Sequence, residues 1–173
     1  MTTIKFDSMP DDARLLIFST ARPLTNPERE RLLAEADAFV ADWSSHREAV
    51  AATREWRHDR FLLVAADENV TALSGCSVDK LVRRMKELGE ELGIRLVDND
   101  GVYFRGGGGI ERAGRAEFAG LVESGAVNGE TIVFNNTVTR LGDLRAGRWE
   151  LPLRDSWHAR AFPPPASPVQ RGA

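Results

Sequence analysis

The order in which apolar patterns follow one another constrains the fold of this 173-residue chain more than any other feature. Short runs rich in apolar residues indicate strands, and longer stretches with apolar residues every three or four positions indicate helices. Six segments carry these patterns, and in chain order they are strand 14–20, helix 25–46, strands 48–56 and 60–66, helix 74–92 and strand 102–105.

This strand-helix-strand-strand-helix-strand order is typical of the split βαβ arrangement of ferredoxin-like folds. We therefore predict an α+β domain over residues 13–105, with an antiparallel four-stranded sheet and both long helices on one face. Thr25 followed by Asn26, Pro27 and Glu28 is a typical helix start, and Gly93 is a typical helix stop.

The rest of the chain predicts a smaller unit and two flexible ends. Residues 106–161 are expected to form a small α/β extension that packs on the first domain, with a short helix at 115–123 and a strand at 131–134. Residues 1–12 are expected to be a flexible lead-in. The run Phe162-Pro163-Pro164-Pro165 opens a tail, 162–173, that is expected to be disordered because proline cannot sustain a helix or a central strand.

Composition excludes several classes of protein. The longest uninterrupted apolar run, 61–66, is far shorter than the roughly 20 residues of a membrane span. The lone Cys76 fits a reducing compartment, so a cytoplasmic protein without membrane partners is expected. A net charge of −3 argues against general nucleic-acid binding. The basic-aromatic hairpin at 54–60 could stack RNA bases, but an ordinary amphipathic hairpin fits it better.

The segment around Cys76 is the strongest candidate for chemistry. Cys76 falls in the first turn of the second helix, where unpaired amides and the helix dipole stabilise a thiolate. The acidic residues Asp67, Glu68 and Asp79 oppose that effect, and Ser74 and Ser77 flank the thiol. The alternative is that Cys76 is a small packing residue, because free cysteine behaves as a hydrophobe.

A nucleophilic thiol needs a histidine within hydrogen-bond reach. In the predicted fold the first helix ends at the edge where the second begins, which places His46 nearest Cys76. His58 lies in the hairpin turn at the opposite edge. His158, beside Trp157, stays open as a partner because the path of residues 141–160 does not follow from the pattern. Each histidine has an alternative role as a solvated or packed residue.

Nucleotide and metal sites are not indicated. Leu73-Ser74-Gly75 is close to the L-S-G-G signature of ABC ATPases, but that signature works only beside a phosphate-binding loop, and the chain contains no Gly-Lys pair. No C-x-x-C, H-x-x-x-H or H-E-x-x-H spacing is present either. We therefore expect no metal or other cofactor.

Three motifs together resemble a family of small bacterial proteins of unassigned function whose members often carry the automatic label "ABC transporter ATPase". The motifs are 74–80 (SGCSVDK), 131–136 (TIVFNN) and 156–160 (SWHAR). The resemblance implies no known activity, and the partial L-S-G-G match accounts for the label. Residues 101–150 are also similar to GYF-like modules, which bind proline-rich peptides.

Two functions follow as hypotheses from the sequence. In the first, the protein is a module that binds a small ligand or a protein partner and is not an ATPase. In the second, it is a thiol-dependent enzyme that uses Cys76 with His46 or His158. The residues expected to contact a ligand are Ser74, Ser77, Asp79, Asp67, Glu68 and Trp157.

Overall fold

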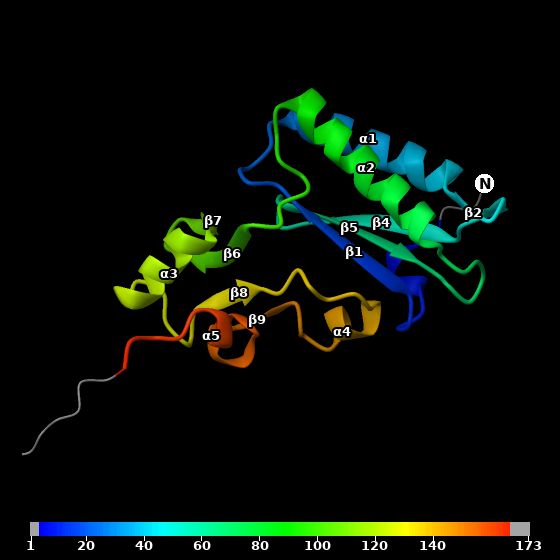
Figure 1. The fold of residues 1–173 in the computed structure, drawn as a ribbon. Helices are drawn as coiled ribbons and strands as arrows, with labels where there is room; N and C mark the ends of the chain where they lie inside the picture. The colour runs from blue at the N-terminus through cyan, green and yellow to red at the C-terminus, as the bar shows by residue number, and fades with distance from the viewer. Residues whose placement is uncertain (1–3, 167–173) are drawn as a thin grey trace, which may run out of the picture. The chain divides into compact units, whose positions relative to one another are not determined.

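In the computed structural model, which describes residues 4–166, the chain forms two units that interleave in sequence (Figure 1). Unit 1 contains the chain up to Asn99 together with Asn136–Trp149, and unit 2 contains Asp100–Asn135 and the chain from Glu150 onward. This division differs from the predicted boundary after residue 105. The reason is that the predicted strand 102–105 pairs with later strands and not with the first sheet.

Unit 1 contains the elements predicted for the first five segments and a few short additions. In chain order its elements are η1 (Phe6–Ser8), β1 (Arg14–Ser19), α1 (Asn26–Asp42), β2 (Ser44–Ser45), β3 (Glu48–Ala49), β4 (Ala52–Arg57), β5 (Phe61–Ala66), α2 (Gly75–Leu92) and α4 (Leu141–Arg145). The predicted strand 48–56 is thus divided, because β2 and β3 form a separate small hairpin.

The main sheet of unit 1 has three strands in the order β1-β5-β4, and both pairings are antiparallel. In β1 and β5, Arg14 lies opposite Ala66 and Ser19 lies opposite Phe61. An α+β protein with antiparallel sheets is confirmed. The four-stranded sheet is not formed, and the prediction of its fourth strand is wrong. In a ferredoxin-like sheet β1 would lie between two other strands. Here it has one neighbouring strand, β5, and is therefore an edge strand of the sheet.

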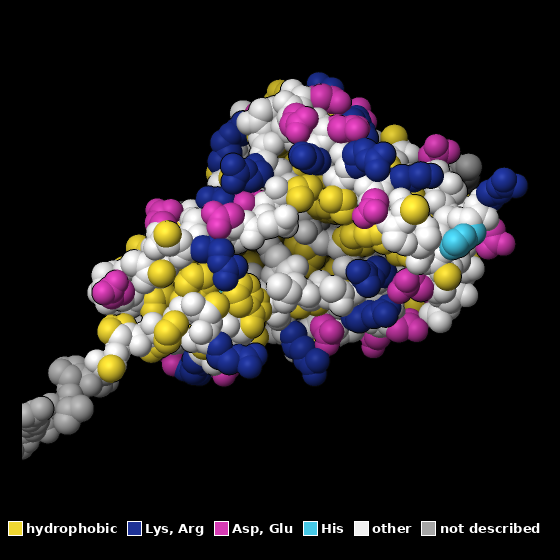
Figure 2. Space-filling model, viewed as in Figure 1, with side chains coloured by type: hydrophobic (Ala, Val, Ile, Leu, Met, Phe, Trp, Pro, Cys, Tyr) yellow, Lys and Arg dark blue, Asp and Glu magenta, His cyan; other side chains and the backbone are white. Residues whose placement is uncertain are grey.

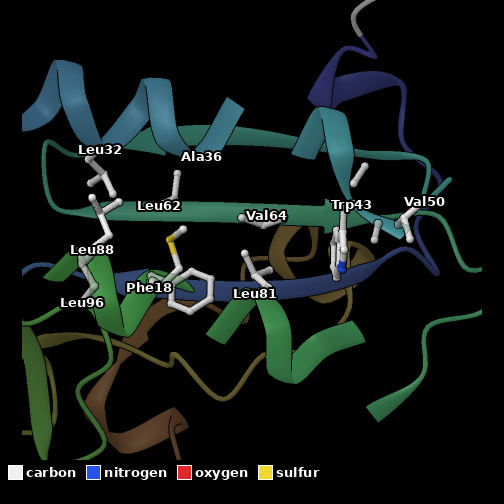
Figure 3. Close-up of a cluster of buried hydrophobic side chains, with 13 residues drawn as sticks. Phe18, Leu32, Ala36, Trp43, Val50, Leu62, Val64, Leu81, Leu88 and Leu96 are labelled. Atoms are coloured by element: carbon white, nitrogen blue, oxygen red, sulfur yellow. The ribbon is translucent and has the colours of Figure 1, made fainter. Parts of the chain in front are cut away.

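Both long helices of unit 1 lie on one face of its sheet, as predicted (Figures 1 and 3). Residues that alternate along β1 and β5, such as Phe18, Leu62 and Val64, share one buried cluster with Leu32 of α1 and Leu81 of α2. Because successive side chains of a strand point to opposite faces, this cluster defines the helix-covered face.

The opposite face of the sheet is covered by segments that the sequence pattern did not assign to it. Phe61, which points away from the helices, makes an edge-on contact with Trp149 at a centroid distance of 5.1 Å. Phe6 and Met9 are buried, and Thr53 donates a hydrogen bond to the Ile4 carbonyl. Residues 4–12 are therefore packed, in contrast to the predicted flexible lead-in, because Phe6 and Met9 supply apolar cover. Residues 1–3 lie outside the described part.

The starts of the two long helices follow the capping chemistry of the sequence. At α1, Thr25 accepts a hydrogen bond from the Glu28 amide while the Glu28 carboxylate accepts one from the Thr25 amide. At α2, the Ser74 hydroxyl accepts from the Ser77 amide, and Gly93 ends the helix at φ 64°. A left-handed residue at this position is normally glycine because it has no Cβ to clash.

Unit 2 has a four-stranded antiparallel sheet in the order β7-β6-β8-β9. In chain order its elements are β6 (Gly101–Gly106), β7 (Gly109–Gly114), α3 (Arg115–Glu123), β8 (Ile132–Phe134), β9 (Glu150–Pro152), η2 (Leu153–Asp155) and α5 (His158–Ala161). Its core contains Phe104, Phe118 and Phe162. Phe162, the first residue of the predicted disordered tail, is thus buried, and residues 167–173 of that tail lie outside the described part.

No helix in the described residues is both long enough and apolar enough to cross a membrane.

Candidate functional site

The structure places Cys76 in the first turn of α2, as predicted. It is the second residue of the helix, directly after Gly75, and its side chain is exposed. The neighbouring Ser77 is buried and donates its hydroxyl hydrogen bond to the Ser74 carbonyl at 2.8 Å. Within residues 4–166, the Cys76 sulfur takes part in no hydrogen bond. The thiol is therefore accessible and without a base beside it.

The end of α1 is fastened to the start of α2, as the predicted topology requires. The indole N–H of Trp43 donates to the Ser77 carbonyl at 3.0 Å. The Ser45 hydroxyl donates to the Ala72 carbonyl at 2.8 Å and accepts from the Ser74 amide at 3.2 Å. His46 directly follows Ser45, so it lies in the turn that borders this junction.

His46 does not complete a thiol–imidazole pair. It is exposed in the tight β2–β3 turn, where its φ is 52°. No hydrogen bond between His46 and Cys76 is present. His58, in the β4–β5 turn, stacks on Trp149 at a centroid distance of 5.6 Å. Neither side chain is positioned as a general base for the thiol.

The acidic residues near Cys76 are engaged elsewhere or exposed. Asp67 accepts a hydrogen bond from the Asn69 amide, which forms a local turn. Glu68 forms an ion pair with Arg140 at 2.9 Å. Asp79 is exposed on α2. In the described residues, none of these three carboxylates is hydrogen-bonded to another residue of the predicted ligand-contacting set.

His158 and Trp157 belong to the core of unit 2. His158 is 2% exposed, and its Nδ1 lies 2.7 Å from the Ser156 hydroxyl. Burial, followed by the nearby Arg115 charge, lowers the pKa of His158 from 6.5 to about 4. The Trp157 ring stacks on His158 at 3.9 Å, and its indole N–H donates to Asn135. These residues stabilise unit 2 through packing.

A groove that the sequence analysis did not anticipate runs along the outer edge of β1. It has a volume of about 350 Å³ and lies within unit 1. Figure 2 shows apolar side chains in the hollow beneath the two long helices. The groove is lined by Arg14–Ser19 of β1, Val82 of α2, Leu96–Asn99 of the following loop and Asn136–Thr139. Its volume falls at the lower end of the range for small-molecule sites.

Arg14 is the residue of this groove whose hydrogen bonds are incomplete. Its Nε atom is buried, and no group in the described part of the chain accepts its hydrogen bond. Leaving a buried donor unpaired costs about 1–3 kcal/mol. Arg14 is also one of the residues that line the groove, and an arginine side chain has rotamers that can present its guanidinium to an acceptor.

The other end of the groove is a fixed polar cluster. The Asn136 side-chain N–H donates to the Ser19 hydroxyl at 3.3 Å, and its Oδ1 accepts from the Trp149 indole N–H at 2.9 Å. The Asp98 side chain, which also lines the groove, is fully buried and lies 3.7 Å from Arg95. The groove therefore has the Arg14 cation at one end of β1 and an amide that is held in place at the other end.

The side chains that line the groove limit the chemistry available to it. Its lining contains no histidine, cysteine, lysine or tyrosine. The Ser19 hydroxyl is held by an amide and not by a base. The described residues also contain no group of three or more His, Cys, Asp or Glu side chains placed to hold a metal ion.

A sequence signal for this groove existed only in part. Asn136 belongs to the motif 131–136, which the family resemblance singled out. Arg14 stands at the start of an ordinary strand, and no sequence motif surrounds it.

Comparison of the chain with known proteins identifies no family. No family model, curated protein or solved structure matches it.

Proposed function

We propose that this protein is a binding protein without catalytic activity of its own, and that the groove along β1 is its ligand site. The observation that carries the proposal is the buried Nε–H of Arg14, which has no acceptor within residues 4–166. A ligand with an anionic oxygen supplies that acceptor. Charge-assisted hydrogen bonds from arginine are about twice as strong as neutral ones and are frequently bidentate.

The strand order of unit 1 supports the groove beside β1 as a regular feature of the fold. The strand order β1-β5-β4 with both helices on one face supports a ferredoxin-like origin for unit 1, in which the fourth strand would lie beside β1. In unit 1 this side of β1 carries the segment Asn136–Arg140 and the groove. The apolar residues of the groove, including Val82 and Val138, favour a ligand with an apolar portion next to its anionic group.

A GYF-like role of unit 2 is the weaker form of the binding hypothesis. The hairpin, helix and strand order of β6, β7, α3 and β8 supports a structural likeness to GYF-like modules. Peptide-binding modules of that type need exposed aromatic rings. In unit 2, however, Phe104, Phe118 and Phe162 pack against one another in the core.

A thiol-dependent reaction at Cys76 is the second candidate function. The observation in its favour is the exposure of the thiol at the first turn of α2. Within residues 4–166 no histidine is hydrogen-bonded to the thiol, and the His158 ring is instead engaged with Ser156. The binding function is therefore preferred.

The binding site is tested by titrating ¹⁵N-labelled protein with small carboxylic acids in an NMR experiment. Acetate, butyrate and benzoate are compared with acetamide, butyramide and benzamide, which have the same shapes without the charge. We expect the acids to shift the Arg14 Nε–H signal and the amide signals of 15–19, and the neutral amides to shift them much less. Equal shifts from both series, or no shifts at 10–50 mM acid (roughly the range in which fragments of this size bind), would falsify the proposal.

A pair of arginine variants provides the control. Arg14→Met keeps the length and apolar stem of the side chain and removes the guanidinium, so it should abolish the acid-dependent shifts. Arg83→Met removes an exposed arginine of α2 that does not line the groove, and the shifts should be unchanged. A loss of shifts in both variants would point to a general charge effect.

A further inference from the structure

The outer edge of β1 is covered by the segment Asn136–Arg140, which runs antiparallel beside it. The two are joined near both ends of β1. The Leu15 amide donates to the Thr139 carbonyl, and the Asn136 side chain donates to Ser19. A ligand of the groove is therefore recognised by the side chains that line it, and the chemistry of these side chains indicates the class of ligand.

Arg14 begins a row of side chains on the helix-covered face of β1. Successive side chains of a strand point to opposite faces. Leu16 and Phe18 belong to the cluster beneath the helices, and Arg14 lies two residues before Leu16 in the same regular strand. The three residues all line the groove. The row therefore presents one cation followed by two apolar side chains.

The apolar part of the groove consists of side chains that the hydrophobic core leaves partly exposed. Leu16 of β1, Val82 of α2 and Val97 of the following loop pack against the core cluster, and each keeps part of its surface open. Figure 3 shows Leu96 on the same side of this cluster as Phe18, so the apolar contacts continue to the end of the row. A hydrocarbon that covers these surfaces removes them from water, which is favourable.

The groove is lined by two charged residues of opposite sign, Arg14 and Asp98. The Arg14 guanidinium forms no ion pair with a described residue, and its Nε–H has no acceptor among them. One negative charge on a ligand therefore satisfies Arg14. A second negative charge has no cation in the lining to pair with and is repelled by Asp98. These charges favour a monoanion over a dicarboxylate or a phosphate monoester.

The length of the row sets the length of the ligand. From Arg14 to Phe18 the strand advances about 13 Å, at about 3.3 Å per residue. Carbon–carbon bonds of about 1.5 Å that meet at about 111° advance an extended hydrocarbon by about 1.25 Å each. A straight chain of about eight to ten carbons therefore reaches from Arg14 to the end of the row.

From these observations we propose that the groove binds a medium-chain fatty acid, an unbranched monocarboxylic acid whose carboxylate pairs with Arg14 and whose hydrocarbon chain lies along Leu16, Phe18 and Val82. This inference rests on the proposed function of the groove and specifies its ligand. The acid binds in its free form, because an ester or thioester has no negative charge for Arg14. A straight chain follows the row, whereas a branched chain of the same size does not reach its end.

The first test titrates the full chain with butyrate, hexanoate, octanoate and decanoate, each below its micelle concentration, and follows the amide signals of 15–19 by NMR. Complete burial of one CH₂ group is worth about fourfold in affinity, so an open groove gives about two- to fourfold per carbon. We expect octanoate to bind at least tenfold more tightly than butyrate. Equal affinity across the series overturns the fatty-acid assignment, and the anion site stands if acetate and benzoate still shift these signals. If no acid shifts them, both proposals fail.

Matched eight-carbon compounds test each part of the assignment. Octanamide removes the charge, 2-ethylhexanoate branches the chain, and suberate and octyl phosphate add negative charge. We expect each of them to bind at least fivefold more weakly than octanoate. Equal binding of 2-ethylhexanoate overturns the straight chain, and equal binding of suberate or octyl phosphate overturns the single charge. Equal binding of octanamide overturns the pairing with Arg14.

Two valine variants test the path of the hydrocarbon chain. Val82→Thr replaces a methyl group in the groove by a hydroxyl, and Val78→Thr makes the same change one turn earlier in α2, at a residue that does not line the groove. We expect octanoate affinity to fall at least threefold for Val82→Thr and less than 1.5-fold for Val78→Thr, with urea unfolding confirming that both fold. Equal losses would overturn the path along Val82.

Arg14→Met tests the position of the carboxylate independently of the valine variants. The variant keeps the apolar stem, so octanoate and octanamide should bind it with affinities equal within about twofold. A preference for octanoate that persists in Arg14→Met would place the carboxylate elsewhere and overturn the inference.

Discussion

Trp43 and Ser77, 34 residues apart in sequence, are joined by a hydrogen bond from the indole N–H to the main-chain carbonyl at 3.0 Å. Trp43 caps the end of α1, and Ser77 lies in the first turn of α2. Both side chains are buried, at 3% and 2% exposure. The bond fixes how the two helices meet at one end of their shared layer.

We predict that Trp43→Phe destabilises the protein. The variant loses a buried hydrogen bond, worth about 0.5–1.5 kcal/mol, and leaves unfilled volume in the cluster around Val64 and Leu81. The free energy of unfolding in urea should fall by about 1–3 kcal/mol with an unchanged m-value.

Trp56→Phe is the matched control for this substitution. The Trp56 indole donates to Asp59 at 3.3 Å in an exposed turn, so water can replace that bond. The Trp56→Phe variant should lose less than about 1 kcal/mol of unfolding free energy. If both variants lose the same free energy, the Trp43–Ser77 bond has no special role in stability.

The buried imidazole of His158 makes unit 2 sensitive to mild acid. Its pKa falls to about 4 in the folded protein, below the 6.5 of an exposed imidazole, because burial and then Arg115 disfavour the charged form. Between these values the unfolded chain binds a proton that the folded chain does not. Stability is therefore highest above pH 6.5 and decreases as the pH falls toward 4.

We predict that this titration removes about 2–3 kcal/mol of unfolding free energy between pH 7.5 and pH 4, at about 1.4 kcal/mol per pKa unit. Urea unfolding at intervals of half a pH unit, followed by tryptophan fluorescence, measures it. His158→Gln should remove most of the pH dependence of the unfolding free energy between pH 7 and pH 5. His46→Gln, an exposed control, should leave the slope as in the wild type. A wild-type slope in the His158→Gln variant would contradict the assignment.

The part of the fold that was predictable is the part encoded by local pattern. Helices α1 and α2 have capping residues and apolar stripes, and β1 and β5 are short apolar runs, so each element is recognisable without its partner. Even the meeting of α1 with the start of α2 followed from the connectivity, and the Trp43–Ser77 bond agrees with it.

The part that was missed depends on pairing between distant residues. The run 102–105 is a strand, as predicted, but its partners Val133 and Arg112 lie later in the chain, and no pattern within the run distinguishes them from β1. The groove was missed for the same reason. A predicted fourth strand filled the edge of β1, so Arg14 had no visible role in the sequence.

Nucleotide binding is predicted to be absent. The chain has no Gly-Lys pair, so it lacks the lysine and glycine-rich loop that hold the phosphates of ATP in P-loop proteins. The Leu73-Ser74-Gly75 sequence instead supplies the cap of α2, because Ser74 accepts from the Ser77 amide. Calorimetric titration with ATP and Mg²⁺ should give no heat of binding at micromolar protein. Micromolar affinity that disappears when magnesium is chelated would overturn this prediction.

The last prediction separates the two candidate functions through Cys76. The thiol is exposed in the first turn of α2, so iodoacetamide should label the folded protein once per chain without denaturant. Because no base is bonded to the sulfur, His46→Ala should leave the labelling rate unchanged within about twofold. Cys76→Ala should change the unfolding free energy by less than about 0.5 kcal/mol, as exposed substitutions usually do, and it should leave carboxylate binding in the β1 groove intact. Labelling only after unfolding would show that the thiol is packed. A labelling rate that depends strongly on His46 would instead favour the thiol-dependent reaction.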